Sequence, residues 1–280
     1  MGHKGSVVVI TGATRGIGRN AALYFAERGY TVVGTGRNEA KLAELEAELR
    51  GAAPESRCFR MDVRDRESVR EAVLGIRSAF DAVDAWINNA GAFAAIGPTW
   101  TVDPDDWVND VETNLIGAFH CVQAVVPWML ERGRGRIVNV VGGGTVGPFR
   151  YGNGYGTSKT ALSRFTENLD VELSDTGVAA FAMDPGLNDT DMTRYQRDTE
   201  AGRTYLPRIE QLFEEKKDES PDRAPRLAYH IAEGKLDAYR GRTLFVHDDE
   251  EKLIALASEL EEGDYTLRLR RHPGAARREG

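Results

Sequence analysis

The sequence predicts an α/β fold in which helices flank a single doubly wound parallel sheet of about seven strands, followed by a C-terminal helical extension. Short runs rich in β-branched residues alternate with amphipathic helical stretches along the chain. A glycine-rich turn separates the first of these runs from the first helix. Polar residues directly follow several of the runs, and such positions meet at one edge of a parallel sheet. Together these observations predict a ligand crevice along that edge.

The expected strands and helices follow one another in regular order. Strand-like runs occupy residues 6–11, 30–35, 56–61, 82–87, 136–141 and 242–246. Helical patterns occupy about residues 17–28, 38–50, 65–80, 104–131 and 206–217, with another helix start at Ser220-Pro-Asp222 and a last helix ending near residue 261. No internal repeat or linker interrupts this order. We therefore expect one domain over residues 1–246 with a lid insertion at about 188–219, and residues 247–280 packed on the same domain.

Composition and charge argue against several classes of function. The net charge is −8, and the basic residues of the terminal segment 268–278 are a short charged end, so we predict no nucleic-acid partner. No apolar run reaches the length of a membrane span, and the first residues lack a signal peptide's apolar region, so we expect no membrane partner. Cys58 and Cys121 have no ligand-like neighbours and indicate buried thiols in a reducing compartment. These features predict a soluble cytoplasmic protein.

The glycine-rich turn Thr11-Gly-Ala-Thr-Arg-Gly-Ile-Gly18 has the composition of a phosphate cradle. Missing side chains let the backbone approach a pyrophosphate, and the following helix offers free N–H groups and the positive end of its dipole. A plain tight turn is the alternative, but the position between a strand and a helix favours a Rossmann-like dinucleotide site. The residues predicted to bind the cofactor here are Gly12, Thr14, Arg15, Gly16, Ile17 and Gly18.

Arg37 bears on the choice between the two nicotinamide cofactors. In dinucleotide-binding folds an acidic residue after the second strand holds the ribose 2′-hydroxyl, whereas a nearby arginine accommodates a 2′-phosphate. Residues 34–36 contain no acid, and Arg15 in the glycine turn supplies a second guanidinium. Arg37 could instead be the solvated start of a helix, but its combination with Arg15 favours NADP(H) over NAD(H).

Three further polar positions suit the same edge of the sheet. Asp62 follows the third strand run, where its carboxylate could bond an adenine amino group or cap the next helix. The fourth run leads into Asn88-Asn-Ala-Gly91, whose amides can tie neighbouring strands together while the chain turns sharply. Asn114 lies near the middle of a predicted helix, which is unfavourable unless its side chain has a task.

Tyr155 and Lys159 lie four positions apart, one helical turn from each other on the same face. An ammonium near a phenol favours the phenolate and lowers the tyrosine pKa from its reference of about 10. A phenol tuned in this way can pass a proton to or from an oxygen near neutral pH. A surface helix pair is the ordinary meaning of this spacing, but the surrounding motifs favour a hydride-transfer site.

These motifs, in this order and at about these spacings, resemble those of the short-chain dehydrogenase/reductase (SDR) family, in its classical branch. The resemblance covers roughly residues 6–246 and rests on the glycine turn, Asp62, residues 88–91, Asn114, the Tyr155–Lys159 pair and Pro185-Gly-Leu-Asn-Asp-Thr190. It implies an enzyme that transfers a hydride between nicotinamide C4 and a carbonyl or carbinol carbon of a small molecule. It also implies a homodimer or homotetramer.

The resemblance implies roles for single residues as well. Tyr155 is similar to the family's catalytic acid/base, Lys159 to the residue that lowers its pKa and holds the nicotinamide ribose, and Asn114 to the residue that positions a proton-relay water. The other residues implied to lie at the cofactor are Asp62, Val63, Asn89, Ala90, Gly91, Pro185, Gly186 and Thr190, the last near the carboxamide.

Gly142 departs from the family pattern, which places there a serine whose hydroxyl bonds the substrate oxygen. Losing one such donor lowers a rate by about a hundredfold in comparable oxyanion sites. Three alternatives are open: Thr145 supplies a hydroxyl from a shifted loop, a backbone N–H of the glycine run replaces it, or the protein catalyses poorly. The sequence favours a working NADP(H)-dependent oxidoreductase with Thr145 as a candidate catalytic residue, and the rival is an NADP-binding protein with little or no catalysis.

The chain after Thr190 resembles the family least. Its polar lid insertion offers candidate apolar contacts at Met192, Tyr195, Tyr205, Leu206, Leu212 and Phe213. Beyond the last strand, where the family often ends, this chain adds a helix and an alternating apolar and basic stretch at residues 264–270, which could cover the surface that many relatives use for tetramers or make a different one. His247 precedes two aspartates, but an acidic helix start explains these carboxylates better than a metal site, so we predict no metal.

Overall fold

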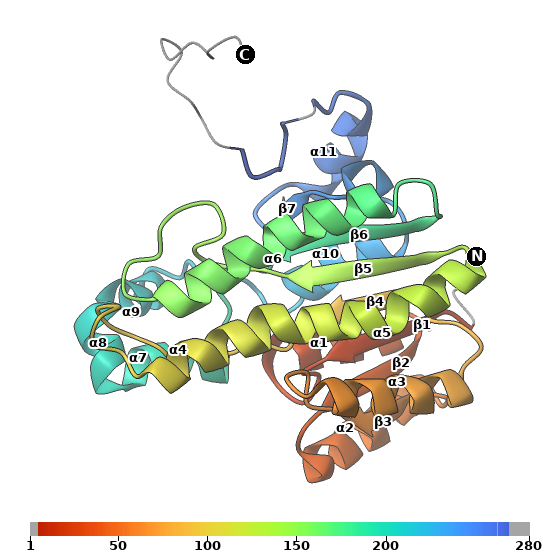
Figure 1. The fold of residues 1–280 in the computed structure, drawn as a ribbon, viewed down its shortest axis with the longest axis horizontal. Helices are drawn as coiled ribbons and strands as arrows, with labels where there is room; N and C mark the ends of the chain where they lie inside the picture. Colours follow the sequence, from red (N-terminus) through yellow and green to blue (C-terminus); the bar gives the residue numbers. More distant parts are fainter. Residues whose placement is uncertain (1–4, 262, 269–280) are drawn as a thin grey trace, which may run out of the picture.

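A computed structural model describes residues 5–261 and 263–268 (Figure 1). Within these residues seven parallel strands form one sheet in the order β3-β2-β1-β4-β5-β6-β7, which confirms the predicted Rossmann-like fold class. The strands are β1 (Val7–Thr11), β2 (Thr31–Gly36), β3 (Arg57–Arg60), β4 (Ala85–Asn88), β5 (Gly135–Val140), β6 (Val178–Asp184) and β7 (Thr243–Phe245). The strand order reverses between β1 and β4, and ligands of such sheets bind beyond the carboxyl ends of the strands at this point.

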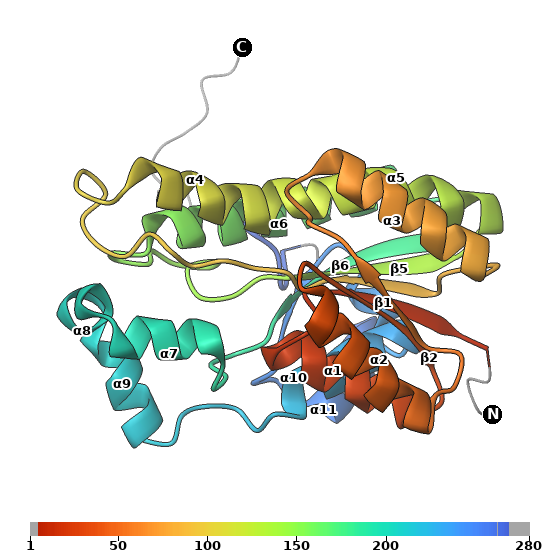
Figure 2. The same ribbon diagram turned by 90° about the horizontal axis from the view of Figure 1, so that it is seen from below.

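Helices cover both faces of the sheet (Figure 2). One layer contains α1 (Gly16–Ala26), α2 (Glu39–Ala52) and α10 (Arg223–Ala232). The other layer contains α3 (Arg66–Ala79), α5 (Gly117–Arg132) and α6 (Asn153–Glu172). Each layer closes over its own buried apolar cluster, so the strands read as continuous apolar runs rather than alternating ones.

The long helix predicted over residues 104–131 is present but is not uniform. It consists of α4 (Pro104–Val111), a π-helical segment η1 (Glu112–Ile116) and α5. By length and composition alone the stretch Pro104–Arg132 could cross a membrane, but half of its most apolar window is buried inside the protein, as in a core helix. The π-helical segment carries Asn114 and turns its side chain inward, as described below.

Residues 188–219, the predicted lid, project beyond the carboxyl ends of the strands (Figure 2). They contain α7 (Asp191–Asp198), α8 (Glu200–Tyr205) and α9 (Pro207–Glu214). Only α9 matches a helix expected from the sequence; α7 and α8 are additional, and the side chains of Thr190 and Thr199 cap their N-terminal ends. The Glu219 N–H donates to the Leu187 carbonyl oxygen at 2.7 Å and closes the base of the lid.

The C-terminal extension packs on the outer edge of the sheet. After η2 (Asp237–Tyr239) and β7, it forms α11 (Glu250–Ala255) and η3 (Leu256–Ser258), so the last helix ends before the expected residue 261. The Thr243 N–H of β7 then donates to the Tyr265 carbonyl oxygen at 2.8 Å, and the Leu267 N–H donates to Glu167 at 2.7 Å. The segment thus covers the free edge of β7, whereas residues 269–278 of the predicted basic end lie outside the described residues.

Candidate active site

The glycine turn after β1 packs directly against the segment after β4. Gly12 and Gly16 have φ angles of +65° and +53°, which favour glycine. A Cβ atom on Gly12 would lie 2.9 Å from the Ala90 Cα, and the Asn89 side chain donates to the Thr11 carbonyl oxygen at 2.8 Å. The backbone of the turn is therefore free of side chains, as binding of a pyrophosphate requires. It lies beside Asn89 and Ala90, which follow β4 and were predicted to bind the cofactor.

Charged residues surround the ends of β2 and β3, where the adenosine half of a dinucleotide would lie. Arg15 pairs with Asp191 of the lid at 3.1 Å, and Arg37 is exposed without an ion pair to any described residue. Asp62 binds the Arg64 guanidinium, which holds the pKa of this carboxyl below its ordinary value. Asp65, and not Asp62, caps α3, so the capping alternative for Asp62 is wrong.

A buried row of side-chain amides joins the middle of the sheet to α6. Asn88 donates to Asn139 of β5 at 2.8 Å, and Asn139 donates to Thr166 of α6 at 2.9 Å. The expectation that amides tie neighbouring strands together at this point is confirmed. Because strands β4 and β5 end here, this row fixes where the segments after Asn88 and Val140 leave the sheet.

Asn114 occupies the π-helical segment and faces the site. Its side chain accepts from the Ala92 N–H at 2.8 Å, donates back to the Ala92 carbonyl oxygen at 2.9 Å and donates to the Ser158 hydroxyl at 3.0 Å. One residue thus links the segment after β4 to the helix that carries Tyr155 and Lys159. The extra residue per turn of a π-helix aims this side chain inward, which explains an asparagine in the middle of a long helix.

Lys159 is almost completely buried, with 3% of its surface exposed. Its ammonium donates to the Val140 carbonyl oxygen at 2.8 Å and lies 5.5 Å from the centre of the Tyr155 ring. Burial lowers the pKa of Lys159 to about 8, because the charged form loses hydration that the surroundings replace only in part.

Tyr155 lies in an aromatic cluster at the mouth of the site. Its ring stacks on Phe93 with 4.6 Å between centroids and meets the edge of Phe149 at 6.2 Å. Burial raises the pKa of Tyr155, and the carboxylates of Asp184 and Asp110 raise it further. Lys159 was expected to lower this pKa, but the shift is upward, and burial of the phenol is its largest cause.

Because Gly142 has no side chain, the Tyr155 hydroxyl can lie close to its backbone. A Cβ atom on Gly142 would lie 2.4 Å from the Tyr155 Oη, so the phenol hydroxyl occupies the space that a serine would need. Thr145 is buried behind this glycine, and its hydroxyl donates to the Gly142 carbonyl oxygen at 2.6 Å. Donation from Thr145 to a substrate would require that bond to break, and its catalytic role stays a prediction.

The turn after β6 returns to the glycine turn. Gly186 has a φ of +67°, and its N–H donates to the Asp184 carboxylate at 2.9 Å. Asn188 donates to the Pro185 carbonyl oxygen at 2.7 Å, which fixes the turn from within. A Cβ atom on Gly16 would lie 3.1 Å from the Thr190 methyl group, so the predicted residues of the two turns face each other.

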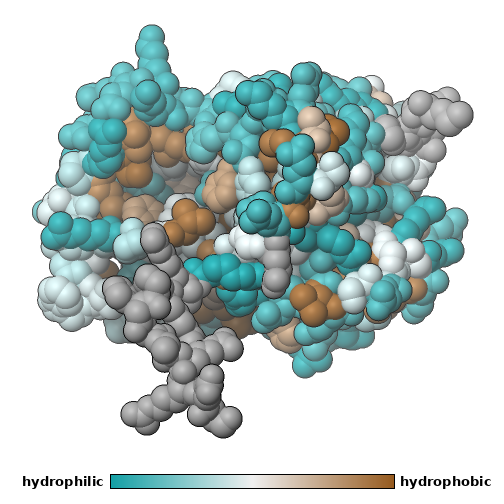
Figure 3. Space-filling view, turned by 90° about the horizontal axis from the view of Figure 1, so that it is seen from above, coloured by the Kyte–Doolittle hydropathy of each residue, from teal (hydrophilic) through white to brown (hydrophobic). Residues whose placement is uncertain are grey.

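Apolar residues of the lid meet the body of the protein around Tyr155. The cluster joins Phe93 and Ile96 of the body to Leu206, with Met192 and Tyr205 against them. Among the other lid contacts expected from the sequence, Tyr195 is 43% exposed, and Leu212 and Phe213 are partly exposed outside this cluster. Figure 3 shows hydrophobic residues between hydrophilic ones on the side of the molecule that carries the lid.

Three residues of the site were not recognised in the sequence. Ser158 and Asp110 lie close to motifs that were recognised: Ser158 stands between Tyr155 and Lys159, and Asp110 lies one helical turn before Asn114. Asp110 is fully buried and accepts from the N–H groups of residues 94 and 95. The third, Phe93, carries no sequence signal that separates it from an ordinary core aromatic. Among the described residues, no group of histidines, cysteines and acids is arranged to hold a metal.

The fold and these converging motifs define a dinucleotide-dependent α/β enzyme. The chain belongs to the short-chain dehydrogenase/reductase family, because the family profile described as short chain dehydrogenase matches residues 6–201.

Several proteins of known activity or structure are similar to this chain. The NADP-dependent 3-hydroxy acid dehydrogenase of Salmonella typhi is 34% identical over 205 residues, or 71% of this chain and 81% of that protein. Sulfoacetaldehyde reductase 2 of Chromohalobacter salexigens is 37% identical over 188 residues, or 67% and 74%. The structure of an actinorhodin polyketide ketoreductase with NADPH has a TM-score of 0.77 at 29% identity and covers 86% of this chain and 95% of its own.

A structure with bound NADP and tartrate is similar to the same degree. It is a gluconate 5-dehydrogenase of Burkholderia cenocepacia in complex with NADP and tartrate, with a TM-score of 0.77 at 29% identity over 86% of this chain and 93% of its own. The protein described here is an NADP(H)-dependent oxidoreductase that acts on hydroxyl or carbonyl groups of small molecules.

Proposed function

We propose that Tyr155 is the acid/base of this oxidoreductase and that the enzyme reduces a small or medium carbonyl compound with NADPH. The observation that carries the proposal is the convergence of Tyr155, Lys159 and Asn114 from two helices beside the carboxyl end of β5. The nicotinamide supplies the hydride, and the protein must hold the substrate oxygen and deliver its proton.

The protonation of Tyr155 favours the reductive direction at neutral pH. Burial raises its pKa, so the phenol keeps its proton and is ready to give it to an oxygen that gains negative charge. Oxidation of an alcohol requires the phenolate instead and should be favoured at higher pH. The ammonium of Lys159 would stabilise the phenolate left after the transfer, and Asn114 holds the helix that carries both residues in place.

The backbone of the glycine run is the candidate for the second donor to the substrate oxygen. The N–H groups of Gly143 and Gly144 find no acceptor in the described part of the chain. Backbone N–H groups serve as oxyanion donors in many acyl-transfer sites. Thr145 remains the side-chain candidate, although its hydroxyl is bonded to the Gly142 carbonyl oxygen.

The rival is a protein of the same fold that binds NADP(H) and catalyses little, with Gly142 as the mark of the loss. The apolar cluster around Tyr155 and the lid argues against it, since it places apolar side chains beside the phenol, where a substrate would bind. The named activities of the relatives, on hydroxy acids and small aldehydes, make short aldehydes and keto acids the first compounds to assay.

The test is the Tyr155→Phe variant. We expect NADPH binding to remain within about twofold, because the ring and its stacking on Phe93 are kept, and turnover of any responsive carbonyl to fall by about 10²–10⁴-fold. NADPH fluorescence measures the binding and NADPH oxidation the turnover. Tyr24→Phe is the matched control, because Tyr24 lies on α1, meets Tyr229 edge-on and is outside the cluster around Tyr155, so its change should leave turnover nearly unchanged. Full turnover in Tyr155→Phe would refute this mechanism.

We also propose that the protein is a soluble cytoplasmic homo-oligomer, and a dimer rather than a tetramer. Val108, Ile116 and Phe119 on α4, η1 and α5 are apolar and 37–44% exposed, as expected of an interface. The edge of β7 is instead occupied by the chain's own segment around Tyr265. A monomer or tetramer in light scattering of the purified protein would contradict the dimer.

A further inference from the structure

The ends of β2 and β3 meet the glycine turn at one corner of the crevice. The Ala13 N–H donates to the Thr35 carbonyl oxygen at 2.9 Å, and the Met61 N–H donates to the Gly36 carbonyl oxygen at 2.8 Å. Gly36 is paired in register with Arg60, the last residue of β3. Arg15, Arg37 and Arg60 therefore leave the backbone from neighbouring positions, although they are far apart in the sequence.

Among the described residues, Arg60 forms an ion pair with one carboxylate. Its Nε lies 3.6 Å from Oε1 of Glu39, the first residue of α2, and the two side chains are 61% and 78% exposed. The pair of Arg15 with Asp191 is similarly exposed, at 61% and 48%. Ion pairs this exposed contribute little to stability, so both guanidiniums can exchange their partners for a stronger anion.

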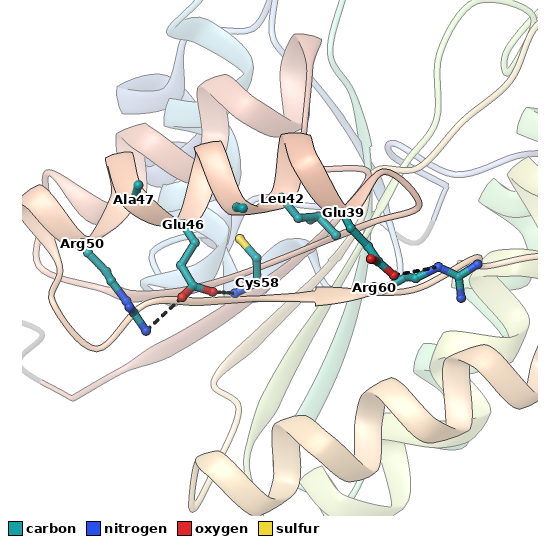
Figure 4. A pocket seen from close by; sticks show the side chains of 8 residues that line it. Glu39, Leu42, Glu46, Ala47, Arg50, Cys58 and Arg60 are labelled. Carbon is teal, nitrogen blue, oxygen red and sulfur yellow. Dashed lines mark hydrogen bonds and ion pairs between the residues drawn. The ribbon is translucent and has the colours of Figure 1, made fainter.

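Figure 4 shows where this pair lies. Glu39 and Arg60 are joined at one end of an open pocket between α2 and β3, and Glu46, Cys58 and Arg50 lie at its other end. The Arg60 guanidinium points away from the pocket and from the body of α2. It is thus available beside the loop between β2 and α2, which carries Arg37.

We propose that Arg60 is a third guanidinium of the site for the ribose 2′-phosphate of NADP(H), and that Glu39 holds it in the free protein. On binding, Arg60 exchanges the Glu39 carboxylate for the phosphate dianion. The proposal rests on the assignment of the 2′-phosphate to Arg15 and Arg37 and extends it to a residue of another strand.

The charge of Glu39 explains why this exchange matters for affinity. A carboxylate in the first turn of α2 suits the helix dipole, but it would repel a phosphate bound at Arg37 two positions earlier. Arg60 offsets this charge and supplies further donors of the fork geometry that suits phosphate. Arg64 cannot do the same, because its guanidinium is bonded to Asp62 and Asn109.

The test separates the 2′-phosphate from the rest of the cofactor by titrating with 2′,5′-ADP and 5′-AMP, and then with NADPH and NADH. We expect Arg60→Met to weaken 2′,5′-ADP and NADPH by about 5- to 20-fold and to change 5′-AMP and NADH by less than about twofold. Glu39→Gln should tighten 2′,5′-ADP by about two- to fivefold, because it removes the competing carboxylate.

Arg57→Met is the matched control, because Arg57 is an exposed arginine at the opposite end of the same strand. Equal effects of Arg60→Met and Arg57→Met on 2′,5′-ADP, or equal losses of 2′,5′-ADP and 5′-AMP in Arg60→Met, would overturn the role of Arg60. Circular dichroism of each variant checks the fold, and Arg60→Lys provides a second variant that keeps the charge but loses the fork. If Arg37→Ala also leaves 2′,5′-ADP unaffected, the 2′-phosphate assignment itself is wrong, which is a separate result.

Discussion

The charged residues at the two ends of the crevice differ in their exposure to solvent. The nucleotide end lies around Arg15 and Arg60, and the catalytic end around Lys159 and Asp110. At the nucleotide end, Arg15 and Arg60 are 61% exposed and are held by single carboxylates. At the catalytic end, Lys159 is 3% exposed, Asp110 is fully buried, and backbone groups supply their hydrogen bonds. At the catalytic end, burial moves the pKa values of Lys159 and Tyr155 away from their ordinary values.

The difference separates two kinds of sensitivity. A charge removed from the nucleotide end leaves a solvated surface, so affinity for the cofactor should change while stability does not. A change at the catalytic end alters both packing and desolvation, so both activity and stability should change. Three variants test this contrast, in order of decreasing expected effect.

The largest effect is expected from Gly142→Ser, which installs the residue typical of the family. Its Cβ would lie 2.4 Å from the Tyr155 Oη, so the tyrosine ring, which stacks on Phe93, has to shift. We expect turnover to fall by about a hundredfold or more, because the phenol leaves its position. The rate of NADPH oxidation with a responsive carbonyl measures it.

Gly147→Ala is the control for this experiment, since a Cβ at Gly147 meets no atom within 4 Å. A gain of activity in Gly142→Ser would show that Tyr155 moves easily and that the glycine is a loss of function. That result would support the rival reading of a protein that binds NADP(H) without useful catalysis.

A smaller effect is expected from Arg37→Ala at the nucleotide end. NADPH should bind about 10- to 100-fold more weakly if Arg37 binds the 2′-phosphate as predicted, because that guanidinium is lost. NADH binding and the free energy of unfolding should stay nearly constant, since Arg37 has no ion pair with a described residue. Fluorescence titration with both cofactors measures the ratio, and equal losses for NADPH and NADH would contradict the assignment.

The smallest effect is the expected change in the free energy of unfolding caused by Lys159→Met. The folded-state pKa of Lys159 is about 8, below the reference of about 10.4, so the unfolded chain binds more protons between these values. Stability of the unchanged protein should therefore rise with pH through this window. At pH 7 the variant should be more stable by about 1–2 kcal/mol after the lost bond to Val140 is subtracted, and the difference should shrink toward pH 10.

Urea unfolding of both proteins at several pH values measures this difference, and groups other than Lys159 contribute equally to both curves. Lys217→Met, at an exposed position of the lid, serves as the control and should show no such dependence on pH. A variant that is less stable than the unchanged protein at every pH would show that the buried ammonium stabilises the fold and would contradict the prediction.

Local sequence patterns were enough to predict most of the fold near the cofactor. The runs around Val8 and Val33 became neighbouring strands, and the long helix through Asn114 was present, because apolar periodicity acts over a few residues. The lid was predicted less well: α7 and α8 are short polar helices whose starts depend on the caps of Thr190 and Thr199 rather than on an apolar stripe. The pKa of Tyr155 could not be predicted from the spacing of Lys159, since desolvation depends on distant residues.

The sequence by itself determined the glycine turn, the Tyr155–Lys159 spacing, the family and the order of strands and helices apart from β6, α7 and α8, because each is a short-range pattern. Only the tertiary structure decided that the Tyr155 hydroxyl fills the space left by Gly142, that the Thr145 hydroxyl bonds the Gly142 carbonyl oxygen and that the segment around Tyr265 covers β7. It also decided that Arg60 lies opposite Gly36, the residue before Arg37. These relations join residues from separate strands and helices, and only the packing of the sheet and its helices sets the distances between them.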